Sequence, residues 1–288
     1  MKKTILAVGA HHDDVELRAG GTLAKYAEEG SKIIYAVAST TPHYHPGGSD
    51  AEAGKFLSNN EVISLRKKEA AEGAEIIGAD EVHFFDFKSL YWYKSNTADR
   101  VYLDGISCTS EHLRYLEEEI PGREFMVSAH RTGAAVGFMA DFIREKAVEI
   151  VLTHSPDDCH WEHYAAANLM LQAVRKLKDA GVFVGLYGWE FGGMGSLCFG
   201  FHPSRFEDIT GTIDVKCRAV SVFKSQFPDR SPEMFAGRAR TRAEAYGRLC
   251  GFKYAEPFTD FNVRGGDGRD ELMLSDTYRP PETVKGLF

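Results

Sequence analysis

Short hydrophobic runs alternate along the chain with longer segments in which hydrophobic residues recur at helical spacing. The runs are mostly apolar throughout, as in strands buried on both faces of a parallel sheet, and cover residues 4–10, 32–40, 81–87, 149–154 and 182–191. The helical patterns cover residues 17–29, 60–78, 134–147, 160–180, 214–225 and 231–250. This alternation predicts an α/β fold of Rossmann-like, three-layer type, with a mostly parallel central sheet between helices.

The predicted elements belong to one domain. A chain of 288 residues is too short for two large domains, and we expect a single domain over residues 1–263. The connections 41–58 and 88–133 are long for a compact domain, and such loops are usually functional. The polar segment 264–288 is expected to be mostly irregular. Parallel sheets bind ligands at the carboxyl ends of their strands, so we expect the active site there.

Two clusters of ionisable residues directly follow predicted strands. The first runs from His11 to Asp14, after the strand at 4–10, and the second runs from His154 to His163. His160 and His163 are three positions apart at the start of a predicted helix, so they share one of its faces. Because both clusters lie at the same edge of one sheet, we expect a metal ion between them.

Residue types and spacing predict which side chains bind this ion. His11, Asp14 and His163 supply two imidazoles and one carboxylate, a set that suits one catalytic zinc ion with an open position for water. Zinc lowers the pKa of such a water to about 7. Neighbouring side chains diverge, so Asp13 cannot aim at the same atom as Asp14, and we predict that Asp13 is the general base.

Three further residues of the second cluster receive predicted roles. His160 is expected to stabilise an oxyanion and to protonate the leaving amine. Glu162 and Asp158 are expected behind the metal ligands, where carboxylates orient imidazoles. A single histidine or aspartate at a strand end is more often a helix cap or a satisfied polar group. The metal hypothesis therefore rests on the joint placement of both clusters.

Other hypotheses stay open for the same residues. Two histidines and one carboxylate also form the facial triad of mononuclear non-haem iron enzymes, so Fe²⁺ is the alternative metal. His154, Asp157 and Asp158 offer further ligands for a two-metal hydrolase such as a phosphoesterase. A non-catalytic carbohydrate- or nucleotide-binding module on the same fold would leave all of these residues idle.

Composition narrows the partners and the compartment. The net charge is −8 without a dense Lys/Arg block, which argues against nucleic acid and anionic membrane surfaces as partners. The apolar run at 4–10 is too short for a signal peptide, and no segment reaches the about 18 apolar residues of a membrane span. Five scattered cysteines indicate reduced thiols and a cytoplasmic protein. The sequence does not fix the oligomeric state; the aromatic residues of the 88–133 connection are compatible with self-association into a homo-oligomer.

Two signatures resemble those of a known family. AHHDDVELRAGGTLAKYAEEG at 10–30 resembles the first signature of the LmbE-like (PIG-L) deacetylases, A-H-P-D-D-x-E followed by a Gly-Gly-Thr helix start. THSPDDCHWEHYAA at 153–166 resembles their second, H-x-x-x-D-x-H-x-D-H. SLRKKEAAEGAEIIGAD, DVKCRAVSVFKSQ and YAEPF resemble later family segments. Together these likenesses anchor most of residues 1–258.

The resemblance implies a zinc-dependent hydrolase that removes the acetyl group from a small N-acetylglucosamine-type sugar or conjugate. It implies the same roles as above, with Asp13 as the base and His160 as the oxyanion residue beside the three metal ligands. It adds Arg66 as the arginine that reaches the substrate. His12 stands where the family has proline, and Glu162 where it has aspartate. The sequence LRAGG also lacks the cysteine that often precedes the two glycines.

Two weaker patterns are expected to lie outside the site. His43 and His45 are spaced like a metal pair but lack a third ligand nearby, so we expect polar loop residues. The arginines of GRARTRAEAYGR at 237–248 are expected on a solvated face or in a subunit contact.

Overall fold

The computed structural model describes residues 2–42, 57–90, 92–94, 101–103, 124–190, 201–226 and 231–261. The predictions for His43, His45 and the tail at 264–288 lie outside these residues, as does much of the 88–133 connection. Within the described ranges, no helix is both long enough and apolar enough to cross a membrane.

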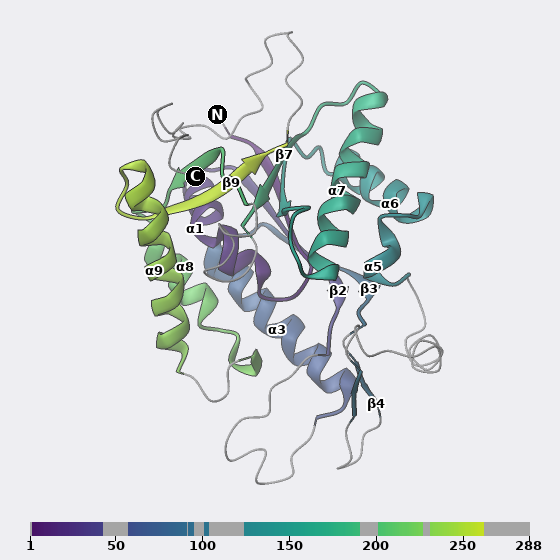
Figure 1. Cartoon of the computed structure of the whole chain (residues 1–288), viewed down its shortest axis with the longest axis horizontal. Coiled ribbons are helices and arrows are strands. Elements are labelled where there is room, and N and C mark those ends of the chain that lie inside the picture. The colour runs from purple at the N-terminus through teal and green to yellow at the C-terminus, as the bar shows by residue number, and fades with distance from the viewer. Residues whose placement is uncertain are drawn as a thin grey trace.

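A seven-stranded sheet forms the centre of the molecule (Figure 1). Its spatial order is β3 (Glu81–Lys88), β2 (Lys32–Thr40), β1 (Thr4–Gly9), β6 (Ile150–His154), β7 (Gly185–Trp189), β9 (Ala255–Asp260) and β8 (Arg205–Asp208). The first five strands in this order are parallel, and β9 is antiparallel to both β7 and β8. The predicted α/β class and mostly parallel sheet are confirmed.

Helices pack in two groups, one on each side of the sheet (Figure 1). One group is α5 (Met126–Ala129), α6 (Gly133–Glu145) and α7 (Trp161–Asp179). The other is α1 (Asp14–Glu28), α3 (Asn59–Ile77), α8 (Ile213–Val220) and α9 (Pro232–Cys250), with the short 3₁₀ helix Lys224–Gln226 after α8. A separate antiparallel pair joins β4 (Trp92–Lys94) to β5 (Val101–Leu103).

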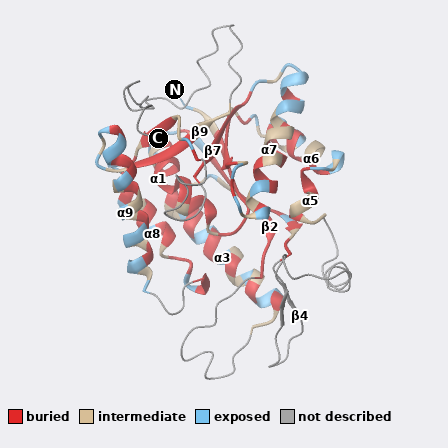
Figure 2. Cartoon of the chain, in the orientation of Figure 1, coloured by how far each residue is buried: buried red, intermediate tan, exposed pale blue. Residues whose placement is uncertain are grey.

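Strand β1 shows how the sequence pattern builds two cores. Leu6 and Val8 belong to the apolar cluster that α6 and α7 cover, whereas Ile5 and Ala7 belong to the cluster under α1 and α3. Successive side chains of a strand point to opposite faces, so a continuous apolar run fits a strand that is covered on both sides. Figure 2 shows the buried residues concentrated along the sheet and the inner faces of the helices.

Local sequence sets the ends of the helices. Ser58 and Glu61 cap α3 reciprocally, and Gly78 ends it in a left-handed conformation with φ 88°, which glycine adopts without strain. Helix α1 begins at Asp14, three residues before the predicted start. Asp14 and Glu16 in its first turn are polar although they are buried, so hydrophobic periodicity does not mark this turn as part of the helix.

The two antiparallel strands were not predicted. β8 has the sequence RFED and β9 the sequence AEPFTD, which includes charged residues and Pro257. Such sequences lack the continuous apolar run of the parallel strands, and proline is rare in strand interiors. β9 pairs with β7 and β8; α9 packs on β9 and on α8, and α8 packs on α1.

Candidate active site

The candidate site lies where the neighbouring strands β1 and β6 reach their carboxyl ends. The segment after β1 carries His11 and Asp13, and α1 begins with Asp14. The segment after β6 leads to His160, which directly precedes α7, and His163 lies in the first turn of that helix. The sheet therefore brings His11 and His163 together across 152 positions of sequence.

Two imidazole nitrogens and the carboxylate of Asp14 lie close together at this edge of the sheet. His11 Nδ1 lies 3.1 Å from His163 Nε2. His11 Nδ1 lies 3.5 Å from Asp14 Oδ2, and His163 Nε2 lies 3.5 Å from the other carboxylate oxygen, Oδ1. Ligand atoms bound tetrahedrally to zinc are about 3.3 Å apart, given bond lengths of about 2.0–2.1 Å. Within the described residues, the groups whose single ligand atoms all lie close enough to share an ion are His11, His160 and His163, and Asp14, His154 and His163. The predicted set of His11, Asp14 and His163 draws on both groups and stays a prediction.

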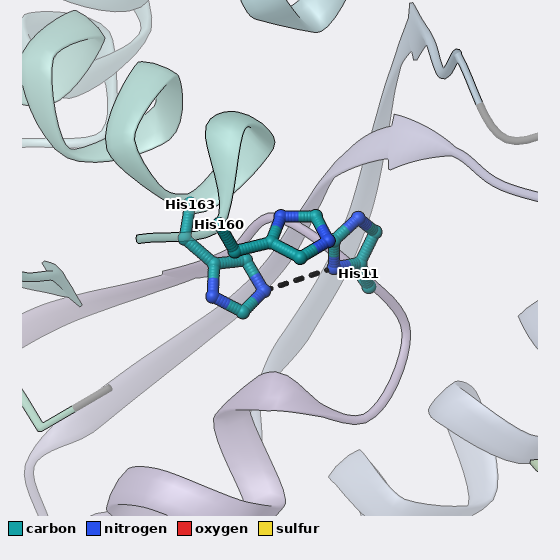
Figure 3. Close-up of side chains that lie close together, drawn as sticks. All are labelled: His11, His160 and His163. Atoms are coloured by element: carbon teal, nitrogen blue, oxygen red, sulfur yellow. Dashed lines mark hydrogen bonds between the residues drawn. The ribbon is translucent and has the colours of Figure 1, made fainter. Parts of the chain in front are cut away.

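His160 completes a layer of imidazoles in the same place. Its ring stacks on His163 with centroids 4.2 Å apart and meets His11 edge-on at 4.9 Å (Figure 3). Ring nitrogens of all three residues lie close enough to share an ion. Burial, together with His11 and His163, lowers the pKa of His160 to about 2, so this imidazole is neutral at physiological pH.

The ring of His154 stacks on that of His163, with centroids 4.0 Å apart. His154 forms a second group with Asp14 and His163. Its Nε2 is 3.1 Å from Asp14 Oδ2, and its Nδ1 lies 3.2 Å from the indole N–H of Trp189. Both groups share His163, so among the described residues they offer overlapping positions for one ion. Asp157 is exposed and belongs to neither group. This arrangement does not favour the two-metal hypothesis.

Two buried carboxylates contact the outer nitrogens of the imidazoles. Glu162 Oε2 lies 2.7 Å from His11 Nε2 and also accepts a hydrogen bond from the Ser89 hydroxyl. Asp158 Oδ2 lies 2.7 Å from His163 Nδ1. Such contacts fix the ring orientation and the tautomer of a ligating histidine. Their role as carboxylates that orient metal ligands stays a prediction.

Mutual interactions shift the pKa values of the three donors. Burial alone would raise the pKa of Asp14. The positive charges of His163 and His154 have the larger effect and hold this pKa well below its usual value. Burial and His154 lower the pKa of His163 to about 4. Burial lowers the pKa of His11, yet hydrogen bonds to Asp14 and Glu162 raise it to about 10. A metal ion would therefore have to displace a proton from His11.

Asp13 stands beside the donors without joining them. It precedes α1, yet its side chain makes no capping hydrogen bond, so the helix does not occupy its carboxylate. Its Oδ1 lies 3.6 Å from Nη2 of Arg66, whose Nη1 donates to the Thr41 carbonyl at 3.3 Å. Burial raises the pKa of Asp13 although Arg66 opposes this shift. The carboxylate lines the cavity beside the guanidinium of Arg66.

His12, the residue in place of the family's proline, does not line the cavity. Its side chain is fully buried, with its ring 5.8 Å from that of Phe84. Neither of its ring nitrogens has a hydrogen-bond partner within the described part of the chain. Burial and the charge of Arg66 keep the pKa of His12 well below its usual value, so it is a neutral core residue.

The later family-like segments brace the helices around the site. Ser225 donates to Glu69 from both its backbone N–H and its hydroxyl, which joins the 3₁₀ helix after α8 to α3. Glu256 in β9 pairs with Lys216 and accepts the backbone N–H of Gly21. These contacts tie α1 to α8 and β9, so the helix that carries Asp14 is held from both sides.

A cavity of about 460 Å³ opens above the donors. Besides the site residues, it is lined by Gln226 and by three arginines, Arg18, Arg238 and Arg242. Arg238 is exposed, in agreement with the solvated face predicted for 237–248, whereas Arg242 is half-buried at the cavity, which that prediction did not anticipate. Arginines occupy several faces of α9, and periodicity cannot tell which face meets α1.

Several known proteins resemble this chain over most of its length. Residues 6–174 match the PIG-L family, described as GlcNAc-PI de-N-acetylase. Diacetylchitobiose deacetylase of Thermococcus kodakarensis is 26% identical over 262 residues, which are 88% of this chain and 81% of that protein. The structure of N,N'-diacetylchitobiose deacetylase from Pyrococcus horikoshii is 20% identical with a TM-score of 0.63, and the match covers 94% of this chain and 89% of that one.

A solved hydratase has a similar fold. The 4-carboxy-2-hydroxymuconate hydratase of Pseudomonas putida is 25% identical with a TM-score of 0.62, and the match covers 92% of this chain and 98% of that one. The family match spans more than half of the present sequence and includes both clusters of the site. The chain belongs to the PIG-L family.

Proposed function

We propose that this protein is a metal-dependent deacetylase that hydrolyses the N-acetyl group of a small N-acetylglucosamine-type sugar or conjugate. One observation carries the proposal: the donor atoms of His11, Asp14 and His163 converge at the floor of a cavity that Asp13 also lines. Membership of the PIG-L family and the names of the two diacetylchitobiose deacetylases support this reaction.

His11, Asp14 and His163 would hold the ion, which we propose to be one Zn²⁺ per chain. Two imidazole nitrogens and one carboxylate oxygen are the donor set of many catalytic zinc sites. When bound, the ion supplies Lewis-acid activation of a water molecule and of the acetyl carbonyl. Glu162 and Asp158 hold the imidazoles of His11 and His163 in place through their outer nitrogens.

Asp13 is the proposed general base. It takes a proton from the attacking water as the water oxygen bonds to the acetyl carbon. It then gives a proton to the amide nitrogen as the carbon–nitrogen bond breaks, so that acetate and a free amine leave. Burial raises the pKa of Asp13, and a base works best when its pKa lies near the operating pH.

His160 and Arg66 act on the substrate. Because the pKa of His160 is lowered to about 2, it acts as a neutral hydrogen-bond donor to the developing oxyanion, and Asp13 carries the proton to the amine. Arg66 Nε is buried and makes no hydrogen bond within the described residues. Its guanidinium lines the cavity beside Asp13, where it can contact the substrate and hold the base in place.

Hydration of a carbon–carbon double bond is the second candidate function. The hydratase from Pseudomonas putida bears the name of a carboxylic-acid substrate, and three arginines line the cavity of this chain beyond Arg66. Addition of water uses the same kind of groups, a base and a cation site. The cavity's positive charge favours this candidate, and its metal site serves both.

Metal analysis and a product screen test the proposal together. The purified protein is expected to contain one zinc per chain and to release amine and acetate in equal amounts from N-acetylglucosamine conjugates. A chelator should stop the release. Loss of the ultraviolet absorbance of a conjugated enoic acid, without amine release from any acetylated compound, would instead establish the hydratase. Two metals per chain would contradict the single-ion site.

A further inference from the structure

We propose that the substrate carries a carboxylate that Arg18 and Arg242 bind at the side of the cavity opposite the imidazoles. We call the three residues Arg18, Arg238 and Arg242 the arginine wall. The inference rests on the proposed function in one respect: it takes the bound carboxylate to be part of the substrate that is deacetylated.

Two helices build the arginine wall. Phe235, Arg238, Ala239 and Arg242 of α9 all line the cavity, and their spacing of three, four and seven positions places them on one helical face. Arg18 lines it from α1, four residues after the metal-site residue Asp14, which corresponds to about 6 Å along the helix axis. The arginines therefore face the same space as the donor atoms.

The described residues supply too little negative charge for this wall. Glu190 Oε1 lies 3.1 Å from Nη1 of Arg242 and 3.6 Å from Nη1 of Arg18. The second carboxylate oxygen of Glu190 accepts the hydroxyl of Tyr246. One carboxylate thus faces two guanidinium groups. Arg66 does not share it, because its own partner is Asp13.

Burial makes the excess positive charge of Arg18 and Arg242 energetically costly. Arg18 is only 9% exposed, and its Nη1 makes no hydrogen bond within the described part of the chain. Burial and the charge of Arg18 lower the pKa of Arg242. Buried cations are costly unless they are paired and hydrogen-bonded. A second carboxylate between these guanidiniums would supply both the charge and the acceptors.

Carboxylate is the anion that fits this arrangement. Guanidinium groups bind carboxylates through paired, charge-assisted hydrogen bonds. Arg238 is exposed at the same face of α9, with its guanidinium 5.6 Å from the ring of Phe235, and adds positive charge that attracts an incoming anion. The volume of about 460 Å³ lies in the range of small-molecule sites. A small acid can reach both the arginine wall and the donors.

Binding of succinate, with succinamide as its neutral analogue, tests the wall directly. Calorimetry on the zinc-loaded protein compares the wild type with Arg18→Met, Arg242→Met and the control Arg248→Met. Each of the first two variants leaves Glu190 paired with the remaining arginine, so the fold does not acquire an unpaired buried carboxylate. Arg248 lies on the same helix with its side chain 77% exposed and paired with Glu244.

We expect the wild type and Arg248→Met to bind succinate equally, and the two wall variants to bind it at least about tenfold more weakly. Succinamide should not bind to any of them. Equal binding of succinate by all four proteins, or no binding by the wild type at millimolar concentration, would overturn the carboxylate site. Equal binding of succinate and succinamide would overturn it as well.

A pair of substrates separates this inference from the proposed function. For N-acetylglucosaminuronic acid against N-acetylglucosamine, we expect a kcat/KM ratio of at least about ten in the wild type and near one in Arg242→Met. Equal rates for both sugars would overturn the carboxylate site and leave the deacetylase standing. If neither sugar releases amine while succinate binding still depends on Arg18 and Arg242, the deacetylase fails and the carboxylate site stands.

Discussion

The cavity has two walls whose charges are organised in opposite ways. We call His11, Asp14, His160 and His163 the donor wall. There, Glu162 and Asp158 contact the outer nitrogens of two imidazoles at 2.7 Å, so the rings are locked in place. In the arginine wall, Arg18 and Arg242 share the single carboxylate of Glu190. The imidazoles of the donor wall thus have carboxylate partners on their outer nitrogens, whereas among the described residues the two buried or half-buried guanidiniums of the arginine wall share one carboxylate within ion-pair distance.

This difference suggests different occupants. A resident ion needs donors that are oriented before it arrives, because their orientation sets its affinity. A substrate that enters and leaves needs charge complementarity without a permanent partner. The donor wall thus suits a cofactor that remains through many turnovers, and the arginine wall suits a group that is exchanged in each one.

Removal of the metal should have the largest effect and should affect only one wall. Dialysis against a chelator is expected to reduce turnover to background, and Zn²⁺ is expected to restore it. Succinate binding should persist in the metal-free protein, because no arginine is a metal ligand. Calorimetry before and after dialysis checks this independence. Loss of succinate binding together with the metal would show that the two walls form a single site.

Asp13→Asn should have the next largest effect, through the base and not through the metal. Removal of a general base typically costs about 10²- to 10⁴-fold in rate, and we expect kcat to fall in this range while the zinc content stays at one per chain. Asp179→Asn, an exposed change at the end of α7, is the control. Near-normal turnover in Asp13→Asn would refute the assignment of the base.

Glu162→Gln should weaken the donor wall alone. Loss of a carboxylate that orients a ligating histidine usually lowers metal affinity about 10- to 100-fold. Competition with a fluorescent chelator measures the zinc affinity, and succinate calorimetry shows whether the arginine wall is unchanged. Glu72→Gln on the exposed face of α3 provides the matched control. Unaltered zinc affinity would mean that the contact with His11 does not orient this ligand.

Gly21→Ala should disturb both walls by a smaller amount, because α1 carries residues of each. A Cβ at Gly21 would lie 2.7 Å from Ile209 Cδ1, and overpacking of this kind costs about 1–3 kcal/mol. Gly237→Ala in α9 meets no atom within 4 Å and should stabilise the protein by about 0.5–1 kcal/mol. Thermal unfolding compares the two variants. Equal stability changes would show that α1 can shift without strain.

The proximity of His11 and His163 was predictable because each lies in the part of the chain that comes after a parallel strand. The carboxyl ends of adjacent parallel strands meet at one sheet edge, so the positions of His11 and His163 in the sequence imply their proximity. The proximity of His154 to Asp14 was harder to predict. It is the last residue of β6, and its proximity to Asp14 depends on how the strand end meets the start of α1.

The arginine wall was not predictable for a different reason. Its assembly requires α9 to face α1, and this depends on the antiparallel strands β8 and β9, whose polar sequences carry no strand pattern. Arg240 pairs with Asp214 and Arg248 with Glu244, whereas Arg242 faces the cavity. Arginines on all sides of a helix look alike in sequence, and only tertiary packing distinguishes them.

The placement of Asp14 and Arg18 on one helix has a consequence for selectivity. Because both belong to α1, the pitch of that helix sets the distance along its axis between the proposed metal ligand Asp14 and Arg18, one of the two arginines that we propose to bind the carboxylate. We therefore expect the enzyme to select acids by length. An acid whose carboxylate lies too near to or too far from the acyl bond can contact either the metal site or Arg18, but not both. Moving the arginine from position 18 to a position one helical turn away should change the length of substrate that is accepted and leave the metal site unchanged.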